Sequence, residues 1–265
     1  MIDLHLHILP DVDDGPGTLA ESRDMLRLAT SFGFSTLVAT PHLQSRISDD
    51  YLELVDEAYA HLRPHADASG IELKRGFEVR IDPGLPAWLR AGDPVALGSS
   101  HTVLVELPFS GWPTFTEHVL FEVQAAGFTP LLAHPERYTA AMEDPDLLLN
   151  LHERGVLFQV TTGSVSGLFG RGAKTLSELL LRRGAVDILA SDAHSAGRRF
   201  VSVTEGLARA TELVGEQRVR ELTVLNPAAL LADRAPIRAE VTLSSSRNAS
   251  GKSAIARVRQ FLPGR

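Results

Sequence analysis

Short apolar runs alternate with amphipathic segments along most of the chain. The apolar runs are nearly continuous, as in strands buried on both faces, and the segments between them repeat their apolar residues with the period of an α-helix. We predict strands at residues 2–8, 37–39, 71–79, 103–107, 131–133, 156–161 and 186–190. We predict the main helices at residues 19–32, 50–68, 116–126, 145–154, 174–183, 201–214 and 216–231, the last interrupted at Pro227.

About seven alternations of strand and helix at this spacing predict a parallel β/α architecture. An open doubly wound sheet is the competing fold, but no glycine-rich phosphate loop follows the first strand, which favours a barrel. Residues 1–233 form the predicted domain. Residues 234–265 are rich in serine, and we expect them to be a poorly ordered tail.

The first predicted strand carries two histidines, His5 and His7, between its apolar residues. Alternate side chains of a strand point to one face, so two imidazoles can bind one metal ion there. An isolated pair of this kind is more often only the polar face of a half-buried strand. The residues at the ends of the other predicted strands distinguish between these interpretations.

Potential metal ligands recur at the carboxyl ends of the predicted strands, which converge on one mouth in a parallel β/α barrel. They are His5, His7, His42, Glu78, Glu106, His134, Asp192 and His194, with Asp14 in the loop after the first strand. Each has a simpler explanation alone, as a loop, turn or cap residue. Together, those explanations require six strands to end in unrelated potential ligands, so we predict a shared metal pocket. Four further histidines, His61, His65, His118 and His152, lie in helical segments and are predicted to be surface residues.

The charge and composition of the chain exclude several classes of function. The net charge is −7, but residues 241–265 carry five bases and no acid, so the rest of the chain has 33 acids, 21 bases and a net charge of −12. A body this acidic is a poor nucleic-acid binder. The absence of cysteine excludes disulfides, thiolate metal sites and a cysteine nucleophile. No signal peptide or membrane-spanning run is recognisable, and we predict a cytoplasmic protein.

Imidazole and carboxylate ligands suit manganese, iron or zinc. Nine ligands are too many for one ion, so two or three ions fit better. Clustered ions lower the pKa of a bridging water and stabilise both the attacking and the leaving oxygen of an in-line displacement. This ligand set therefore predicts phosphoester hydrolysis through attack by metal-bound hydroxide.

Arginines near these ligands are candidates for binding the phosphoryl group. Arg137 lies three residues after His134, and its planar fork matches phosphate oxygens. The alternative for Arg137 is an ion pair with Glu136 or a helical neighbour. Arg198 and Arg199 follow His194 and are weaker candidates of the same kind.

The chain resembles the PHP (polymerase and histidinol phosphatase) superfamily in the order of these residues. Within it, the runs HLHILPDVDDGP, ATPH, RGFEV, LVELP, LAHPERY and SDAH are similar to the manganese-dependent tyrosine-protein phosphatases of bacterial capsule and exopolysaccharide clusters. The resemblance covers about residues 1–232. It implies a distorted seven-stranded β/α barrel that holds up to three ions, with Mn²⁺ expected and iron or zinc as alternatives.

The resemblance also implies roles for individual residues. His5, His7, Glu78 and Asp192 would surround one ion, Asp14, His42 and His194 a second, and Glu106 with His134 a third. Arg137 matches the phosphate-binding arginine of the family, and either Arg198 or Arg199 matches the second. The implied substrate is phosphotyrosine in the tail of a cognate tyrosine kinase that controls polysaccharide export. The sequence leaves a homo-oligomer open.

Three other functions compete with this interpretation. A histidinol-phosphate phosphatase, or another phosphatase of small phosphomonoesters, would use the same metal core. An amidohydrolase would often bridge two metals through a lysine at a strand end, but Lys74, Lys174 and Lys252 do not end strands. A non-catalytic metal-binding protein is disfavoured because all nine ligands and Arg137 are present.

Overall fold

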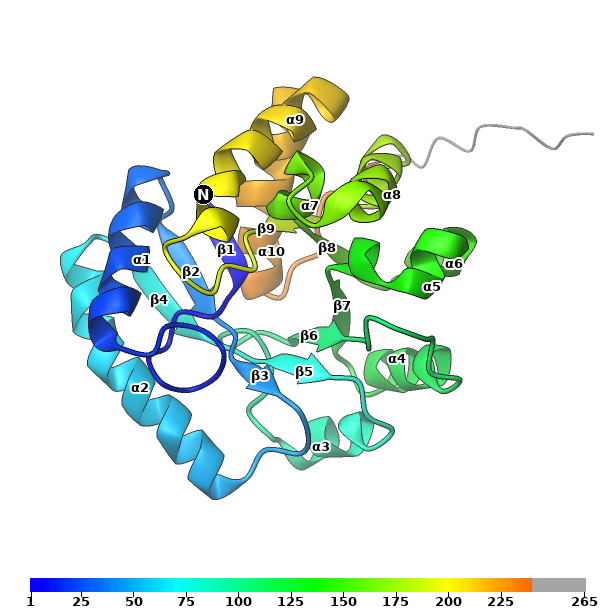
Figure 1. Cartoon of the computed structure of the whole chain (residues 1–265). Helices are drawn as coiled ribbons and strands as arrows, with labels where there is room; N and C mark the ends of the chain where they lie inside the picture. The colour runs from blue at the N-terminus through cyan, green and yellow to red at the C-terminus, as the bar shows by residue number, and fades with distance from the viewer. Residues whose placement is uncertain (240–265) are drawn as a thin grey trace, which may run out of the picture.

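Nine parallel strands and the helices between them make up residues 1–239, the part of the chain that the computed structural model describes (Figure 1). The strands are β1 (Ile2–Leu6), β2 (Thr36–Ala39), β3 (His42–Leu43), β4 (Glu72–Arg75), β5 (Glu78–Arg80), β6 (Thr102–Glu106), β7 (Thr129–Ala133), β8 (Leu157–Thr161) and β9 (Ile188–Ala190). Each of the seven predicted strand segments overlaps at least one of them. The predicted β/α alternation is therefore confirmed.

The strands form two sheets, in the orders β1-β2-β4 and β3-β5-β6-β7-β8-β9. The expected distorted seven-stranded barrel is therefore confirmed only in part, because the strands of residues 1–239 form no closed sheet. The order of the strands still corresponds to seven strand positions. Two of these positions are each occupied by two short strands, β2 with β3 and β4 with β5. Each broken strand thus contributes one piece to each sheet.

A proline lies at one break and a closely packed glycine at the other. Pro41, between β2 and β3, has no N–H group to continue a ladder. Gly76, between β4 and β5, lies so close to Leu97 that a Cβ there would stand 2.7 Å from its Cδ2 atom. At the open side, the start of the loop after β9 reaches β1 through the hydrogen bonds from His7 N to the Ala193 carbonyl and from Asp192 N to the His5 carbonyl, 2.8 and 2.9 Å long.

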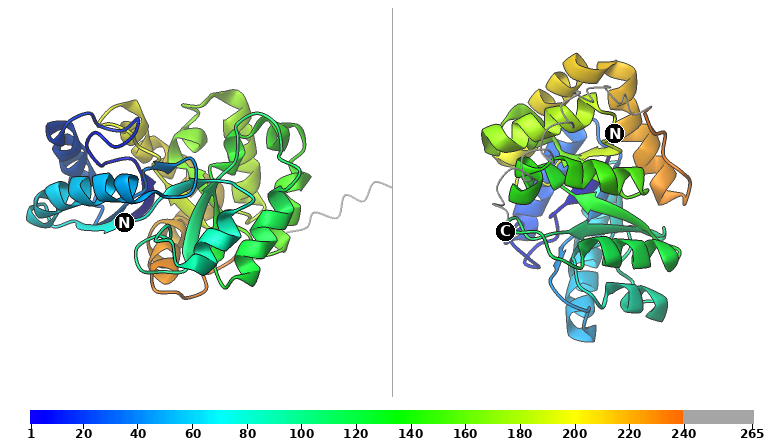
Figure 2. Two further views of the ribbon diagram at one scale, coloured as in Figure 1. Left: turned by 90° about the horizontal axis from the view of Figure 1, so that it is seen from below. Right: turned by 90° about the vertical axis from the view of Figure 1, so that its right-hand side faces the viewer.

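The helices lie outside the strands, as the three views show (Figures 1 and 2). They are α1 (Leu19–Ser31), α2 (Asp49–Ala68), α3 (Leu85–Ala91), α4 (Thr116–Ala125), α5 (Thr139–Glu143), α6 (Asp146–Glu153), α7 (Thr162–Ser166), α8 (Gly170–Arg182), α9 (Arg198–Arg220) and α10 (Asn226–Leu231), with a 3₁₀ helix η1 (Pro135–Arg137) and a π-helix η2 (Glu221–Leu225). Helices α7 and α9 approach each other closely, where Gly206 faces the carbonyl group of Thr162. None of the helices within residues 1–239 combines the length and apolar character needed to cross a bilayer.

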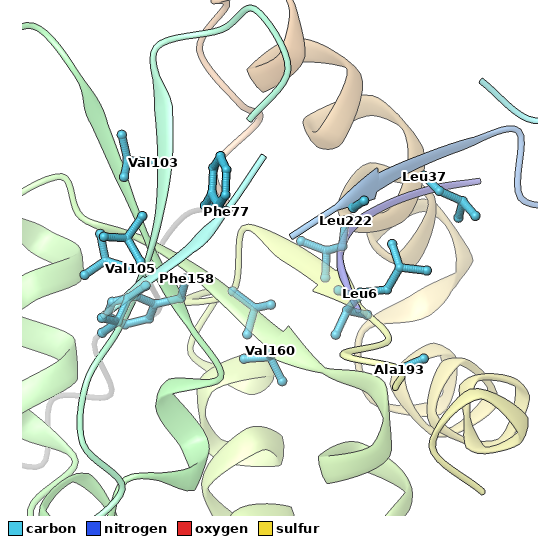
Figure 3. Close-up of a cluster of buried hydrophobic side chains, with 14 of the residues drawn as sticks. Leu6, Leu37, Phe77, Val103, Val105, Phe158, Val160, Ala193 and Leu222 are labelled. Atoms are coloured by element: carbon cyan, nitrogen blue, oxygen red, sulfur yellow. The ribbon is translucent and has the colours of Figure 1, made fainter. Parts of the chain in front are cut away.

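Buried apolar side chains form two clusters. The larger includes Leu6, Leu37 and Phe158, and part of it is drawn in Figure 3. The smaller contains residues such as Leu4 of β1, in one sheet, and Leu131 of β7, in the other. Both sheets therefore contribute to this second cluster, as they do to the first.

Residues 234–239, which we assigned to the tail, contact the domain. Ile237 N donates to Asn226 Oδ1 at 2.7 Å, and Arg238 Nη2 donates to the His152 carbonyl at 2.7 Å. His152 itself is buried, with its Nε2 atom 3.0 Å from Asp187 Oδ2, so its assignment to the surface was wrong. The helical pattern of residues 145–154 hid this, because His152 lies on the inner face of α6. Residues 240–265 of the predicted tail lie outside the described residues.

Candidate metal centre

All nine predicted ligands come together in one cluster, and most of them lie at or after the carboxyl end of a strand. His5 lies on β1, His42 begins β3, Glu78 begins β5 and Glu106 ends β6. The others follow strands: His7 and Asp14 come after β1, His134 after β7, and Asp192 and His194 after β9. A cavity of about 220 Å³ opens among them. It is lined by Asp14, His42, Gln44, Glu78, Arg80, Glu106, Phe109, His134, Arg137, Asp192, His194 and Arg199.

The nine side chains form four overlapping groups whose ligand atoms lie within 4.8 Å of one another. The groups are His7, Asp14, His42 and His194; His5, Glu78 and His134; His5, His7 and Asp192; and His42, Glu78 and Glu106. The division expected from the resemblance differs from these groups, since His7 joins the Asp14 group and Glu78 joins both Glu106 and His134. Several residues are therefore shared between neighbouring groups.

Glu78 is the buried centre of the cluster. Its Oε2 atom lies 3.3 Å from Nε2 of both His5 and His7 and 2.9 Å from Nδ1 of His42. Its Oε1 atom lies 2.8 Å from His134 Nε2. Burial alone would raise the pKa of Glu78, but these imidazoles hold it well below its usual range.

His5 and His194 have strongly perturbed pKa values when no ion is bound. Burial lowers the pKa of His5, but Glu78 and Asp192 outweigh it and raise the pKa to about 9. His194 is different, because burial and the neighbouring charge of His7 lower its pKa to about 4. Burial and the charge of Glu78 raise the pKa of Glu106. Such closely packed opposing charges are typical of a functional site.

Two residues that the sequence analysis missed orient the histidines of the first strand and its end. His5 Nδ1 lies 2.7 Å from Gln159 Oε1, and His7 Nδ1 lies 2.6 Å from Asp13 Oδ2. Both acceptors place the ring proton on Nδ1 and leave Nε2 facing the cluster, as in known metal-binding histidines. Gln159 could have been noticed as a polar residue inside an apolar strand.

Arg137 lies beside the predicted ligands on η1. Its Nη1 atom donates to Asp192 Oδ2 at 2.7 Å. It forms no ion pair with Glu136, whose Oε1 atom accepts instead from Ser164 Oγ at 2.6 Å and from Thr161 N at 3.0 Å. These hydrogen bonds fix the turn that presents Arg137 to the cavity.

The structure distinguishes the two remaining arginines. Arg199 lines the metal cavity, with Nη1 at 2.6 Å from His194 Nδ1 and 3.8 Å from Asp192 Oδ2. Arg198 lines a separate cavity with Glu205 of the next helical turns. Consecutive residues at the start of a helix point in different directions. Arg198 is therefore not placed at the candidate site.

The backbone is unusual at two predicted ligands. His134 and Asp192 have φ angles of 32° and 51°, a left-handed region that residues other than glycine rarely adopt. Both follow directly or closely on a strand, and the turn aims each side chain back over the strand ends. Backbone conformations of this kind cluster at functional sites.

Comparison with known proteins gives consistent results. The family model for capsular polysaccharide synthesis proteins, CpsB/CapC, matches residues 1–232. Tyrosine-protein phosphatase YwqE of Bacillus subtilis is 35% identical over 209 residues, which cover 78% of this chain and 82% of the relative. Tyrosine-protein phosphatase CpsB of Streptococcus pneumoniae is 28% identical over 243 residues, covering 88% and 99%.

Solved structures agree with the sequence matches. A crystal structure from a study of YwqE and CpsB, described as unique metal-dependent tyrosine phosphatases, superimposes with a TM-score of 0.84 at 32% identity, covering 90% of this chain and 97% of that one. A histidinol phosphate phosphatase from Lactococcus lactis, with zinc, histidinol and phosphate bound, has a TM-score of 0.51 at 14% identity, with 80% and 93% coverage, and shares the fold alone. The resemblance inferred from the motifs is confirmed, and the chain belongs to the CpsB/CapC family.

Proposed function

We propose that this chain is a metal-dependent phosphatase that hydrolyses phosphotyrosine in proteins. One observation carries the proposal: nine imidazole and carboxylate side chains form one cluster, and seven of them line a single cavity together with Arg137. The names of relatives at 28–35% identity support phosphotyrosine over histidinol phosphate as the substrate. Catalysis would reside in residues 1–233.

The donor set fits a group of divalent ions. Glu78 Oε2 and Nδ1 of His42 and His134 are buried and make no hydrogen bond of acceptable geometry within the described structure. Unpaired buried polar atoms are uncommon, and ions bound in the cluster would satisfy such atoms. Nitrogen and carboxylate ligands without thiolate suit Mn²⁺, and the four overlapping groups suit two or three ions.

Bound ions would supply Lewis acidity, which lowers the pKa of coordinated water and neutralises phosphoryl oxygens. Arg137 donates one of its N–H groups to Asp192, and its other donors would bind phosphoryl oxygens. Arg199 Nη1 lies 3.8 Å from the same Asp192 oxygen, so Arg199 adds a second positive charge to the same cavity. Tyrosinate leaves with an ordinary pKa near 10, so these residues need not include a strong general acid.

The physiological substrate would be a phosphotyrosine-bearing protein. We propose the tail of a cognate tyrosine kinase that regulates capsule or exopolysaccharide synthesis. The support is the family to which the chain belongs and the phosphatase names of its relatives.

The direct test measures hydrolysis of p-nitrophenyl phosphate, a phosphotyrosine peptide and histidinol phosphate by the full chain with Mn²⁺ and after chelation. We expect Mn²⁺-dependent hydrolysis of the two aryl phosphates. Activity that survives exhaustive chelation would refute the metal mechanism. Histidinol phosphate as clearly the best substrate would refute the phosphotyrosine assignment.

The role of Arg137 needs a matched comparison. Arg137→Ala should retain bound metal and lose most turnover, because it removes phosphoryl contacts and none of the nine ligands. Arg27→Ala is the control, since Arg27 is an exposed arginine of α1 that pairs with Asp24 away from the cavity. Loss of metal in Arg137→Ala would show instead that this arginine maintains the structure of the site.

A further inference from the structure

Phe109 is the only apolar side chain among the twelve described residues that line the metal cavity. This residue is 41% exposed and lies in the loop after β6. Hydrogen bonds hold its backbone in place. The Phe109 carbonyl accepts from Thr139 N at 2.9 Å and from Thr139 Oγ1 at 3.1 Å. A large apolar ring is thus held at the edge of a polar cavity while remaining accessible to solvent.

The neighbours of the Phe109 ring place it beside the phosphate-binding arginine. The Arg137 Cζ atom lies 4.5 Å from the ring centroid, and the ring of His134 lies 5.3 Å away at an angle of 30°. The exposed ring of Phe109 therefore lies next to the predicted phosphoryl contact.

A second phenylalanine contacts the same guanidinium group. Arg137 Cζ lies 4.2 Å from the ring centroid of Phe169, which also lies 5.2 Å from Arg199 Cζ. Phe169 does not line the cavity. The two rings thus differ: Phe169 contacts both arginines from outside the cavity, whereas Phe109 contacts Arg137 from within it.

A phosphotyrosine whose phosphoryl group is bound by Arg137 would carry its aryl ring close to Phe109. Its phosphoryl group would lie among the charged residues, and the aryl group attached to it would extend away from them toward the mouth. An aryl ring beside Arg137 would lie within the roughly 4.5–7 Å range in which aromatic pairs attract each other. The geometry points to Phe109 as the residue that recognises the aryl ring of the substrate and so favours phosphotyrosine over alkyl phosphates, an inference that rests on the proposed function.

Direct binding tests this role without catalysis. Phenylphosphonate and methylphosphonate share a phosphonate group and differ in the aryl ring. Calorimetry with the Mn²⁺-loaded full chain would compare the wild type with Phe109→Ala, Phe109→Tyr and the control Phe121→Ala, which truncates an exposed ring of α4 outside the cavity.

We expect the wild type to bind phenylphosphonate more tightly than methylphosphonate. Phe109→Ala should lower the affinity for phenylphosphonate by about two- to tenfold, which is the effect of losing one aromatic pair. The affinity for methylphosphonate should not change. Phe109→Tyr keeps the ring and should bind like the wild type, as should Phe121→Ala. Phe109→Tyr should also keep its normal metal content and bind phenylphosphonate tightly. This result would show that substitution at position 109 does not by itself disrupt the site.

Three results would overturn the inference. These are equal binding of both ligands by the wild type, equal weakening of both by Phe109→Ala, and no weakening by Phe109→Ala. Equal weakening would mean that Phe109 only holds Arg137 in place. Failure of the wild type to hydrolyse any aryl phosphate would refute the proposed function, but the binding comparison would still report on Phe109.

Discussion

Asp13→Asn should weaken metal binding although Asp13 is not among the predicted ligands. Asp13 Oδ2 lies 2.6 Å from His7 Nδ1 and accepts from His42 N at 3.1 Å, while its Oδ1 accepts from Gly15 N at 3.0 Å. The carboxylate therefore connects two metal-facing histidines. An amide is neutral, and one of its two polar atoms cannot accept, so an asparagine at this position cannot maintain the arrangement.

The expected size follows from the role of such carboxylates. A carboxylate behind a metal-binding histidine fixes its tautomer and raises its basicity, and its removal typically reduces metal affinity about 10- to 100-fold. That loss corresponds to about 1.4 to 2.7 kcal/mol. In the metal-free protein, burial lowers the pKa of His7, but the hydrogen bond to Asp13 and the contacts with Glu78 outweigh burial and raise this pKa to about 10.

Calorimetric titration of Mn²⁺ into metal-free protein measures this effect directly. Asp11→Asn is the matched control, because Asp11 is an exposed acid of the same loop. It has a φ of 58°, which asparagine adopts readily. The control should bind Mn²⁺ like the wild type. Unchanged affinity in Asp13→Asn, or an equal loss in Asp11→Asn, would refute the reasoning.

Three further predictions concern stability. Burial raises the pKa of Asp3 from 3.8 to about 6, so its ionised form destabilises the metal-free fold by up to about 3 kcal/mol above pH 6. Asp3→Asn should therefore raise the free energy of unfolding in urea at pH 8 and have little effect at pH 4, where Asp3 is protonated in the folded state. Gly206→Ala should lower the free energy of unfolding by about 1 to 3 kcal/mol, because its Cβ would overlap the Thr162 carbonyl oxygen. Mn²⁺ at about 100 times its Kd should stabilise the chain by about 2.7 kcal/mol per independent site, which raises Tm by about 5 to 10 °C relative to chelated protein.

Each of these predictions has a contradicting result. The same stability difference between Asp3→Asn and the wild type at both pH values would exclude titration of Asp3 as the cause. A Gly206→Ala variant as stable as the wild type would show that α7 and α9 can separate easily. A Tm that does not depend on Mn²⁺ would contradict preferential binding of the ion to the folded state.

The sequence predicted the strands well because most are continuous apolar runs. It could not predict the breaks, since the approach of Gly76 to Leu97 joins residues from different parts of the chain. Two of the predicted strands therefore divide between the sheets, and a single closed barrel is not formed. Local patterns specify elements, whereas closure depends on long-range packing.

The candidate site was predictable where side chains follow strands. Asp192 and His134 line the cavity, and their positions after strands were enough to select them. Asp13, Gln159 and Phe109 were not selected, because their roles depend on which distant residue they contact. A sequence shows potential ligands more readily than it shows the residues that orient them.

The overlap of the four ligand groups couples metal ions that bind there. His5, His7, His42 and Glu78 each belong to two groups, so an ion in one group immobilises ligands of its neighbour. Binding of the first ion would include the entropy cost of ordering these shared side chains. The next ion would bind a partly ordered site and so with a smaller entropy cost. Because Glu78 belongs to two groups, its substitution would change the affinity of both groups for their ions. The loss of one ion would then also weaken binding of the other. Metal occupancy would then be a cooperative property of the whole cluster, because no ligand group is independent of its neighbours.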